Sequence, residues 1–392
     1  MENIIYAASD IFPSPKGSTS RIAATLSLIK ELGDKVFFFC QGDRSMPLVQ
    51  KEENIVIRRF RPDDTNFLKR SLSYSNFIEQ NLHLMKEPPQ VVHFRDPWSA
   101  LPLLKHNICS SSKKIYEING LPSIELPVHY PHLVFYSKMI KKLKQLELDC
   151  MKKADKIITV SNTNKSYITS LGICEEKIAI IPNSGEMPLN SEDNQCNDQI
   201  DISGNYIIYA GTLAPWQGIS TLFQSFSLIK NECDLTLVIA SSTTKYLSKI
   251  KKEARKLGIL ERIKIETGVS RKRLSILYKN GLFSLCPLTR GDRNELQGCC
   301  PVKILESMWT GTPVIASRLP VTSEIMQHGK DGWLVEPESP RALASAILKL
   351  WQDEELLKSL GENAVIKVKR SFSKDLFHQR LRRVYDELGA NN

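Results

Sequence analysis

The sequence RNELQGCCPVKILESMWTGTPVIA, residues 293–316, combines a loop that contains a glycine, a short helix with one carboxylate and an apolar strand. Gly298 lets the backbone come close to a ligand, and Pro301 suits the first position of a helix, where no N–H group is needed. Gly311 is expected to end that helix. The run Pro313–Ala316 is short, apolar and β-prone, so it predicts a central parallel strand.

The N-terminus of the predicted helix faces the loop and carries unpaired N–H groups and the positive end of the helix dipole. Such a terminus can hold a diphosphate without a metal ion. Glu306 lies more than one turn further along, where its carboxylate can accept hydrogen bonds from ribose hydroxyls. The stretch therefore predicts a nucleotide-sugar site.

The size and composition of the chain indicate a globular protein of two domains. Its 392 residues exceed what one hydrophobic core usually supports. Hydrophobic residues make up 42% and charged residues 24%, which argues against a disordered or fibrous protein. No apolar run is long enough to span a bilayer, and residues 1–7 lack the features of an export signal, so we expect a cytoplasmic protein.

The nine cysteines form no paired C-x-x-C units, so neither a disulfide framework nor a zinc site is expected. Cys299 and Cys300 are adjacent and flank the predicted nucleotide site. They are either metal or redox ligands or small residues packed beneath the nucleotide. Two adjacent cysteines without a second pair favour the packing role.

The formal net charge of +10 favours negatively charged partners such as nucleotide sugars, an anionic membrane face or nucleic acid. Lysines gather in residues 137–144 and again at Lys152 and Lys153, in one segment with apolar residues at helical spacing. One interpretation is a solvated helix face, and the other is peripheral attachment to anionic lipid. Aromatic residues make up only 8% and no RNA-recognition signature is present, so no nucleic-acid partner is expected.

Short apolar runs alternate with helical patterns along the chain, which predicts βαβ units and parallel sheets. A polar segment, residues 187–205, separates two series of such runs. We therefore predict an α/β fold of two doubly wound, Rossmann-like domains, with ligands at the carboxyl ends of the strands in a central cleft. The predicted strands are Ile4–Ala7, Val36–Cys40, Ile55–Ile57, Val91–Phe94, Ile115–Ile118, Ile157–Val160, Tyr206–Tyr209, Leu235–Ala240, Ile263–Glu266, Phe283–Cys286 and Pro313–Ala316.

The predicted domains follow from this division. Residues 1–186 form an N-terminal domain that binds the acceptor, and residues 187–205 form a linker. Residues 206–372 form a C-terminal domain that binds the nucleotide sugar. Residues 373–392 are expected to form an amphipathic helix that crosses back to the N-terminal domain.

The order and spacing of the motifs resemble the retaining glycosyltransferases of family 4, the group 1 class, which have the two-domain GT-B fold. The resemblance covers nearly the whole chain. It rests on the opening stretch and on the segments Pro13–Arg21, Val91–Trp98, Tyr116–Pro122, Ala154–Ser161, Ile181–Ser184, Tyr209–Leu213 and Trp216–Gly218.

The resemblance implies that Glu306 holds the ribose of the donor. Similar enzymes often have a second glutamate eight positions earlier that touches the transferred sugar, and this chain has Gly298 there. A subgroup instead has a Pro-x-Lys-x-x-Glu pattern, which Pro301, Lys303 and Glu306 match. Glu295 is a candidate substitute for the missing carboxylate, and Cys299, Cys300 and Val302 are expected to line the donor site with these residues.

A second departure concerns the diphosphate. Similar enzymes usually carry an arginine and a lysine where this chain has Thr212 and Gln217. Charge-assisted hydrogen bonds are about twice as strong as neutral ones, so the loss needs a replacement. Our hypothesis is that one or two of Arg290, Arg293 and Lys303 stabilise the leaving group instead.

In the N-terminal domain, the loop around Gly17 and Ser18 precedes a helix predicted from about Ser20 to Leu32, with Arg21 at its start. We expect this loop to admit a donor phosphate or an acceptor hydroxyl, although a simple turn remains open. Asn119 lies where similar enzymes often have a histidine that contacts the sugar. His93 and Asp96 fall at the end of a strand and either orient the acceptor or satisfy a buried turn.

The expected function is transfer of a sugar from a nucleotide-diphosphate sugar to a saccharide, glycolipid or small-metabolite hydroxyl, with retention of configuration. Neither a metal ion nor another cofactor is expected, since no Asp-x-Asp motif is present. The absence of a P-loop and of a Gly-x-Gly-x-x-Gly fingerprint argues against an NTPase and a dehydrogenase. The alternatives are a GT-B epimerase or hydrolase and a noncatalytic GT-B subunit that supports a partner transferase.

Overall fold

The computed structural model describes residues 1–14, 17–64, 66–187, 202, 204–241 and 243–389. These fall into two compact units. The N-terminal unit comprises Met1–Pro182 and Phe377–Asn392, and the C-terminal unit comprises Asn183–Leu376. The expected linker, residues 187–205, lies almost wholly outside the described residues.

The N-terminal unit is built on a sheet of eight strands in the order β3-β4-β2-β1-β5-β6-β7-β8. Neighbouring strands are parallel, except that β3 runs antiparallel to β4. The strands are β1 (Asn3–Ile11), β2 (Lys35–Gln41), β3 (Val49–Glu52), β4 (Ile55–Phe60), β5 (Val91–Phe94), β6 (Lys113–Ile118), β7 (Lys156–Thr159) and β8 (Ile178–Ile180).

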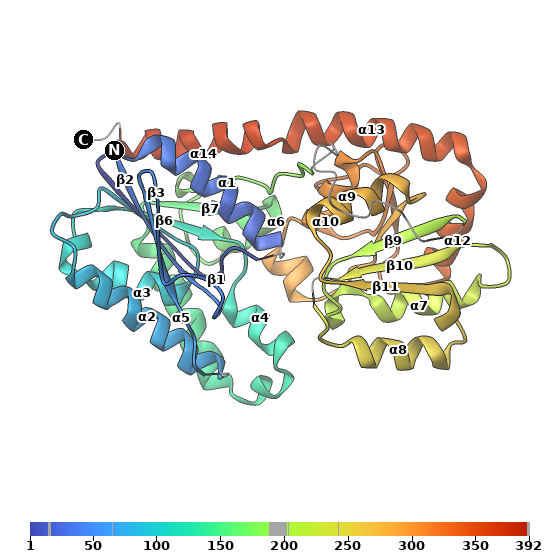
Figure 1. Ribbon diagram of the computed structural model, residues 1–392, viewed down its shortest axis with the longest axis horizontal. Coiled ribbons are helices and arrows are strands. Elements are labelled where there is room, and N and C mark those ends of the chain that lie inside the picture. The colour runs from blue at the N-terminus through green and yellow to red at the C-terminus, as the bar shows by residue number, and fades with distance from the viewer. Residues whose placement is uncertain (15–16, 65, 188–201, 203, 242, 390–392) are drawn as a thin grey trace. The chain divides into compact units, whose positions relative to one another are not determined.

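Helices cover both faces of this sheet (Figure 1). Ile5 and Ala7 of β1 pack with α2, α3 and α5, whereas Ile4 and Tyr6 pack with α1 and α14. Because both faces are buried, the central strands β1, β2 and β5 are mostly apolar instead of alternating. The helices are α1 (Gly17–Leu32), α2 (Phe67–His83), α3 (Pro97–Lys105), α4 (Pro122–His129), α5 (Ser137–Lys153), α6 (Asn162–Ser170) and α14 (Lys374–Gly389).

Helix α14 belongs to the N-terminal unit from Phe377 onward, although it ends the described chain. In Figure 1 it lies beside α1, the first helix of the chain. His378 lies 3.0 Å from the Ser27 hydroxyl of α1, and apolar residues of α14 join the core beneath α1. These core residues are Phe377, Leu381, Val384, Tyr385 and Leu388.

The C-terminal unit is built on a sheet of six parallel strands in the order β11-β10-β9-β12-β13-β14. Ile207 and Tyr209 of β9 pack with α7, α8 and α12, and Tyr206 and Ile208 pack with α9. The strands are β9 (Tyr206–Ala210), β10 (Thr236–Ser241), β11 (Ile263–Thr267), β12 (Ser284–Cys286), β13 (Val314–Ser317) and β14 (Trp333–Val335). The helices are α7 (Ile219–Leu228), α8 (Leu247–Lys256), α9 (Arg271–Asn280), α10 (Val302–Trp309), α11 (Pro320–Ser323), α12 (Pro340–Gln352) and α13 (Glu354–Phe372).

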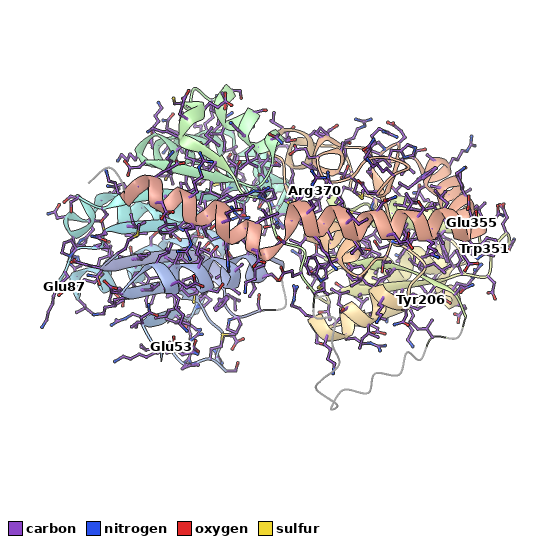
Figure 2. The ribbon with its side chains drawn as sticks, turned by 90° about the horizontal axis from the view of Figure 1, so that it is seen from above. Glu53, Glu87, Tyr206, Trp351, Glu355 and Arg370 are labelled. Atoms are coloured by element: carbon purple, nitrogen blue, oxygen red, sulfur yellow. The ribbon has the colours of Figure 1, made fainter. Side chains whose placement is uncertain are left out.

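The two longest helices of the C-terminal unit, α12 and α13, meet at a sharp turn. Trp351, at the end of α12, and Glu355, at the start of α13, lie close together there (Figure 2). Arg370 marks the far end of α13 (Figure 2). Asp353 begins α13 by accepting a hydrogen bond from the Leu356 N–H at 2.9 Å, so the turn is stabilised by a side-chain cap.

The structure has three strands that the sequence patterns did not predict, namely β3, β8 and β14. Strand β3 contains Gln50, Lys51 and Glu52 and lies at the sheet edge, where polar side chains remain exposed. Strands β8 and β14 have three residues each, too short for a periodic signal. Among the described helices, none is both long and apolar enough to cross a bilayer.

Candidate functional site

The predicted nucleotide site lies entirely within the C-terminal unit. After β12 the chain forms a π-helical turn at Arg293–Gln297, then Gly298 with a φ of +79°, and α10 begins at Val302. Pro301 has a ψ of 103°, so it precedes the helix instead of occupying its first position as predicted. Proline fixes φ but leaves ψ free, and the extended ψ of Pro301 directs the chain from the loop to the start of α10.

Glu306 is buried in α10, with 7% of its surface exposed. Its Oε1 accepts a hydrogen bond from Arg271 Nη1 at 2.9 Å, and Arg271 Nη2 donates to the Glu186 carbonyl at 2.7 Å. Burial raises the pKa of the Glu306 carboxyl, and Arg271 opposes that shift. No described residue donates a hydrogen bond to the second oxygen, Oε2, so Glu306 keeps an acceptor for a ligand.

Lys303 lies one turn before Glu306 and points to the loop after β9. Its Nζ lies 2.6 Å from Gln217 Oε1 and 3.1 Å from the Tyr209 hydroxyl, with the Tyr209 ring centroid at 4.2 Å. A Cβ on Gly211 would lie only 2.7 Å from Nζ, so glycine makes room for the ammonium group. Burial lowers the pKa of Lys303 to about 8, and the charge of Arg293 adds to the effect.

Arg293 lies over the indole of Trp216, with its guanidinium carbon 5.6 Å from the ring centroid. Its Nη1 also donates to Asn294 Oδ1 at 3.0 Å. Trp216 therefore packs against a cation in this loop. Because Trp216 directly precedes Gln217, which contacts Lys303, the two cations lie in the same part of the site.

Arg290 and Glu295, two other candidates from this loop, pair with each other on the surface. Arg290 Nη1 lies 3.0 Å from Glu295 Oε1, and Arg290 Nη2 lies 2.7 Å from Glu336 Oε1. Glu295 Oε2 also accepts from the Gly291 N–H at 2.8 Å. Both oxygens of Glu295 are therefore engaged, and Arg290 is shared by two carboxylates, so Lys303 and Arg293 are the better candidates for holding phosphate.

The remaining donor-site candidates contribute mainly backbone and packing. Cys299 and Cys300 are buried, and the Cys300 carbonyl accepts from Asn183 Nδ2 at 2.8 Å. Within the described part of the chain, no group of three histidine, cysteine or acidic residues could hold a metal ion. Val302 begins α10, and the Thr212 carbonyl accepts from the Tyr209 hydroxyl.

In the N-terminal unit, α1 begins at Gly17, three residues earlier than predicted. Gly17 and Ser18 therefore lie in the first helical turn and not in a preceding loop. Arg21 is not presented to a ligand as expected: it is buried, its Nε pairs with Glu117, and its Nη1 donates to the Ile181 carbonyl at 2.7 Å. A buried guanidinium needs a charged partner, and Glu117 supplies it.

His93 is the next-to-last residue of β5 and is fully buried. Its Nε2 lies 3.2 Å from Glu117 Oε2, and its Nδ1 lies 2.9 Å from the Tyr385 hydroxyl of α14. Burial lowers the pKa of His93. Burial alone would raise the pKa of Glu117, but Arg21 and Arg95 hold it well below its usual range.

Asp96 caps α3, which agrees with the buried-turn interpretation. Its Oδ1 accepts from the Ser99 N–H and its Oδ2 from the Ser9 N–H, both at 2.9 Å. Asn119 directly follows β6, and its Nδ2 donates to Glu117 Oε1 at 2.8 Å. A carboxylate only accepts, so this bond turns Asn119 Oδ1 away from Glu117.

The buried network around Arg21 and His93 is completed by Glu117, Arg95 and Tyr385. Sequence reasoning did not identify these last three residues as part of it. The available signal was a glutamate inside the apolar strand Ile115–Ile118, because a buried carboxylate requires partners. Nothing in the sequence identifies those partners, since Tyr385 lies 268 residues away.

Two family models match the chain: "Glycosyltransferase Family 4" over residues 16–184 and "Glycosyl transferases group 1" over residues 192–366. Together they cover most of both units. A capsular polysaccharide biosynthesis glycosyltransferase of Staphylococcus aureus, CapM, is 24% identical over 338 residues, which cover 81% of this chain and 83% of CapM.

Solved structures share the fold at low sequence identity. Sucrose-phosphate synthase from Thermosynechococcus elongatus has a TM-score of 0.81 and 16% identity, with 100% of both chains covered. Alr3699/HepE of Anabaena, in complex with UDP and glucose, has a TM-score of 0.75 and 16% identity, covering 99% of this chain and 100% of HepE. HepE has also been solved in complex with UDP-glucose. These likenesses confirm the predicted α/β fold.

Proposed function

Because this chain belongs to the family 4 glycosyltransferases, the group 1 class with the GT-B fold, we propose that it transfers a sugar from a nucleotide-diphosphate sugar to a hydroxyl acceptor, with retention of anomeric configuration. Family membership makes the chain a glycosyltransferase of class EC 2.4. The donor, the acceptor and the stereochemistry belong to the proposal and rest on the residues around α10.

The position of Lys303 beside Gln217 is the observation that carries the proposal. Similar enzymes place a lysine where this chain has Gln217, and here the ammonium of Lys303 lies 2.6 Å from the Gln217 side chain. A cation from α10 thus occupies the neighbourhood that the resemblance assigns to a phosphate-binding cation. Arg293 adds a second positive charge nearby.

Glu306 supports the ribose end of the donor. Lys303 and Glu306 are three residues apart, so they lie on one face of α10, about one turn from each other. A nucleotide whose diphosphate contacts Lys303 can therefore reach Glu306 with its ribose. Glu306 Oε2 accepts a ribose hydroxyl, while Arg271 keeps Oε1 occupied.

In the proposed reaction, the bond between the anomeric carbon and the diphosphate oxygen breaks while the acceptor oxygen bonds to the same face of that carbon. The departing phosphate oxygen takes the proton of the acceptor hydroxyl, so no protein base is required. Lys303 and Arg293 stabilise the charge that develops on the diphosphate, the kind of contribution worth about 3 to 4 kcal/mol per donor. These two cations do the work expected of the missing arginine and lysine, without a metal ion or other cofactor.

We assign the acceptor to the N-terminal unit, where Asn119 Oδ1 is the available polar group after β6. The name of CapM supports an acceptor in polysaccharide biosynthesis. The complexes of HepE with UDP and UDP-glucose support a nucleotide sugar as donor. Both the donor class and the acceptor class are transferred to this chain from the names of similar proteins, so both require a direct test.

The test is thermal unfolding with UDP, GDP and ADP, each free and linked to sugars, on the wild type and on Glu306→Gln. A ligand at 100 times its dissociation constant stabilises by about 2.7 kcal/mol, enough to raise the Tm by several degrees. We expect one nucleotide to raise the Tm of the wild type and to do so less in the variant. Glu31→Gln, which makes the same change at an exposed carboxylate of α1 paired with Arg382, serves as the matched control and is expected to behave like the wild type.

A Tm that no nucleotide changes would contradict the proposal and favour a noncatalytic subunit. Once a nucleotide is identified, its sugar conjugates are incubated with acceptor and the anomeric configuration of the product is read by NMR. Donor hydrolysis without transfer, even with saccharide acceptors present, would favour a hydrolase instead.

A further inference from the structure

An exposed aromatic pair precedes α5 in the N-terminal unit. Phe135 is 88% exposed and Tyr136 is 59% exposed, and α5 begins at the next residue, Ser137. Among the large apolar side chains that the structure describes, Phe135 is the most exposed. Leaving a phenylalanine in water forgoes the free energy of burial, so two adjacent exposed aromatic side chains indicate a surface that meets a partner.

The first two turns of α5 add a dense positive charge to this pair. Lys138, Lys141 and Lys142 are exposed, and residues 137–144 contain no acidic side chain. The spacing of the three lysines places them on one side of the helix. We refer to Phe135, Tyr136, Lys138, Lys141 and Lys142 as the aromatic–lysine surface.

The rest of α5 holds this surface rigidly. Leu143, Cys150 and Met151 are buried in the same core as β5 and β6, and α5 lies against that layer in Figure 1. Just before the aromatic pair, Tyr130 and Leu133 also pack against this core. The exposed aromatic side chains therefore stand on an anchored turn and do not result from a fraying helix.

We propose that the aromatic–lysine surface binds the face of a bilayer that contains anionic phospholipid. Aromatic side chains favour the headgroup level of a membrane, where an apolar body and a polar neighbourhood are both accommodated. Each lysine near an anionic bilayer strengthens binding about fivefold. The charge of the whole chain, +10, has the sign that such a surface attracts.

The arrangement favours a bilayer over a nucleic acid. Single-stranded nucleic acids are bound along a groove in which aromatic side chains and cations follow the backbone. Here the aromatic pair lies at one end and the lysines gather over two turns of one helix, which suits a planar charged surface with an apolar layer beneath it. The proposal does not depend on the donor site, and it can be tested without any transferase assay.

The experiment is sedimentation of the full chain with vesicles of phosphatidylcholine, alone and mixed in equal amounts with phosphatidylglycerol. We expect binding to the mixed vesicles only, weakening as salt rises. Lys138→Gln/Lys141→Gln/Lys142→Gln should weaken binding about 100-fold, and Phe135→Ala/Tyr136→Ala about tenfold.

The matched control changes the same charge elsewhere. Lys249, Lys251 and Lys252 are exposed on α8 of the C-terminal unit, and the described side chains beside them include no strongly exposed aromatic pair. Lys249→Gln/Lys251→Gln/Lys252→Gln should weaken binding less than about twofold, since these three lysines are not part of the aromatic–lysine surface. A second measurement uses Phe135→Trp, whose added fluorescence should shift to the blue with mixed vesicles and not with phosphatidylcholine.

Three results would overturn the proposal. One is no sedimentation of the wild type with mixed vesicles at low salt. Another is an equal loss of binding in the α8 variant, which would show a response to net charge alone. The third is a tighter association with single-stranded RNA than with vesicles that depends on the same five side chains.

Discussion

Two buried glutamates, one in each unit, differ in how many of their carboxylate oxygens have partners. Glu117 is 1% exposed and contacts Arg21, Arg95, His93 and Asn119, so both of its oxygens are occupied. Glu306 is 7% exposed, and Arg271 Nη1 lies 2.9 Å from its Oε1.

The pKa values follow the number of partners. The cations around Glu117 hold its pKa well below the usual range, whereas burial raises the pKa of Glu306 because a single arginine compensates less. A carboxylate with every oxygen satisfied stabilises the fold, and one with an oxygen left over can take up a ligand. The comparison thus separates a glutamate whose two oxygens both have partners from one that an arginine contacts at Oε1, although the sequence pattern at both is an acid among apolar residues.

The largest expected effect is the loss of stability in Glu117→Gln. Removing this charge leaves Arg21 buried without its anion and Arg95 with Asp10 alone, which should destabilise the protein by about 3 to 5 kcal/mol in urea unfolding. Glu306→Gln should cost less than about 1 kcal/mol in the same experiment, because Arg271 is 40% exposed and is solvated without its partner. Equal losses in the two variants would break the comparison.

The pH dependence of stability in the wild type and in Glu117→Gln sharpens this prediction. Because the folded pKa of Glu117 lies below the ordinary value of 4.5, its stabilising contribution is present above that pH and is lost as the pH falls. Wild-type stability should therefore decline more steeply below pH 4.5 than that of Glu117→Gln. Parallel acid-unfolding curves would show that Glu117 is not the group responsible.

Turnover should fall next most strongly in Lys303→Gln. Losing a cation directed at the developing diphosphate charge should lower kcat about 100-fold or more, with the free energy of unfolding unchanged or improved. Lys303→Arg, which keeps the charge in a longer side chain, should recover part of the rate. A kcat that neither variant changes would leave Arg293 as the remaining candidate cation.

A smaller effect is expected on donor binding in Glu306→Gln. Hydrogen bonds to a charged group contribute about 1.5 to 3 kcal/mol, so donor affinity should fall roughly tenfold to 100-fold. The corresponding 2′- and 3′-deoxynucleotides should bind the wild type as weakly as the intact nucleotide binds the variant. If Glu306→Gln lowered the affinity for the deoxynucleotides by the same factor as the affinity for the intact nucleotide, the ribose would not contact Glu306.

The smallest expected effect is a decline of kcat/KM at high pH, the alkaline limb of the pH profile. The pKa of Lys303 is about 8, so the ammonium loses its proton above that pH, and kcat/KM for the donor should fall about tenfold per unit. In Lys303→Arg this limb should move beyond the measured range, because arginine stays protonated. An unchanged limb in that variant would assign it to another group.

Much of the fold followed from the sequence because parallel strands buried on both faces are apolar throughout. Strand β5 matches its predicted range, Val91–Phe94, and the other predicted strands differ from the observed ones by a few residues at their ends. The edge strand β3 was not predicted because it is polar and pairs on one side only. Short-range signals locate strands, but an edge position depends on contacts far along the chain.

The candidate site was predictable to a lesser degree. The position of Lys303 near Gln217 could be proposed from the family pattern, but its contact required two segments 86 residues apart to meet. Arg21 looked like a ligand-binding cation because a polar segment containing Gly17 precedes it, and only the structure shows Glu117, 96 residues away, as its partner. Local patterns identify charged residues, whereas tertiary partners decide whether a charge is available.

The central claim is that α10 presents Lys303 to a diphosphate, and titration calorimetry at pH 7 tests it most directly. The nucleoside diphosphate identified by thermal unfolding and its monophosphate are each titrated into the wild type and Lys303→Gln. The account predicts that the variant binds the diphosphate about 100-fold more weakly and the monophosphate almost unchanged. Equal affinities of the two proteins for the diphosphate would contradict it.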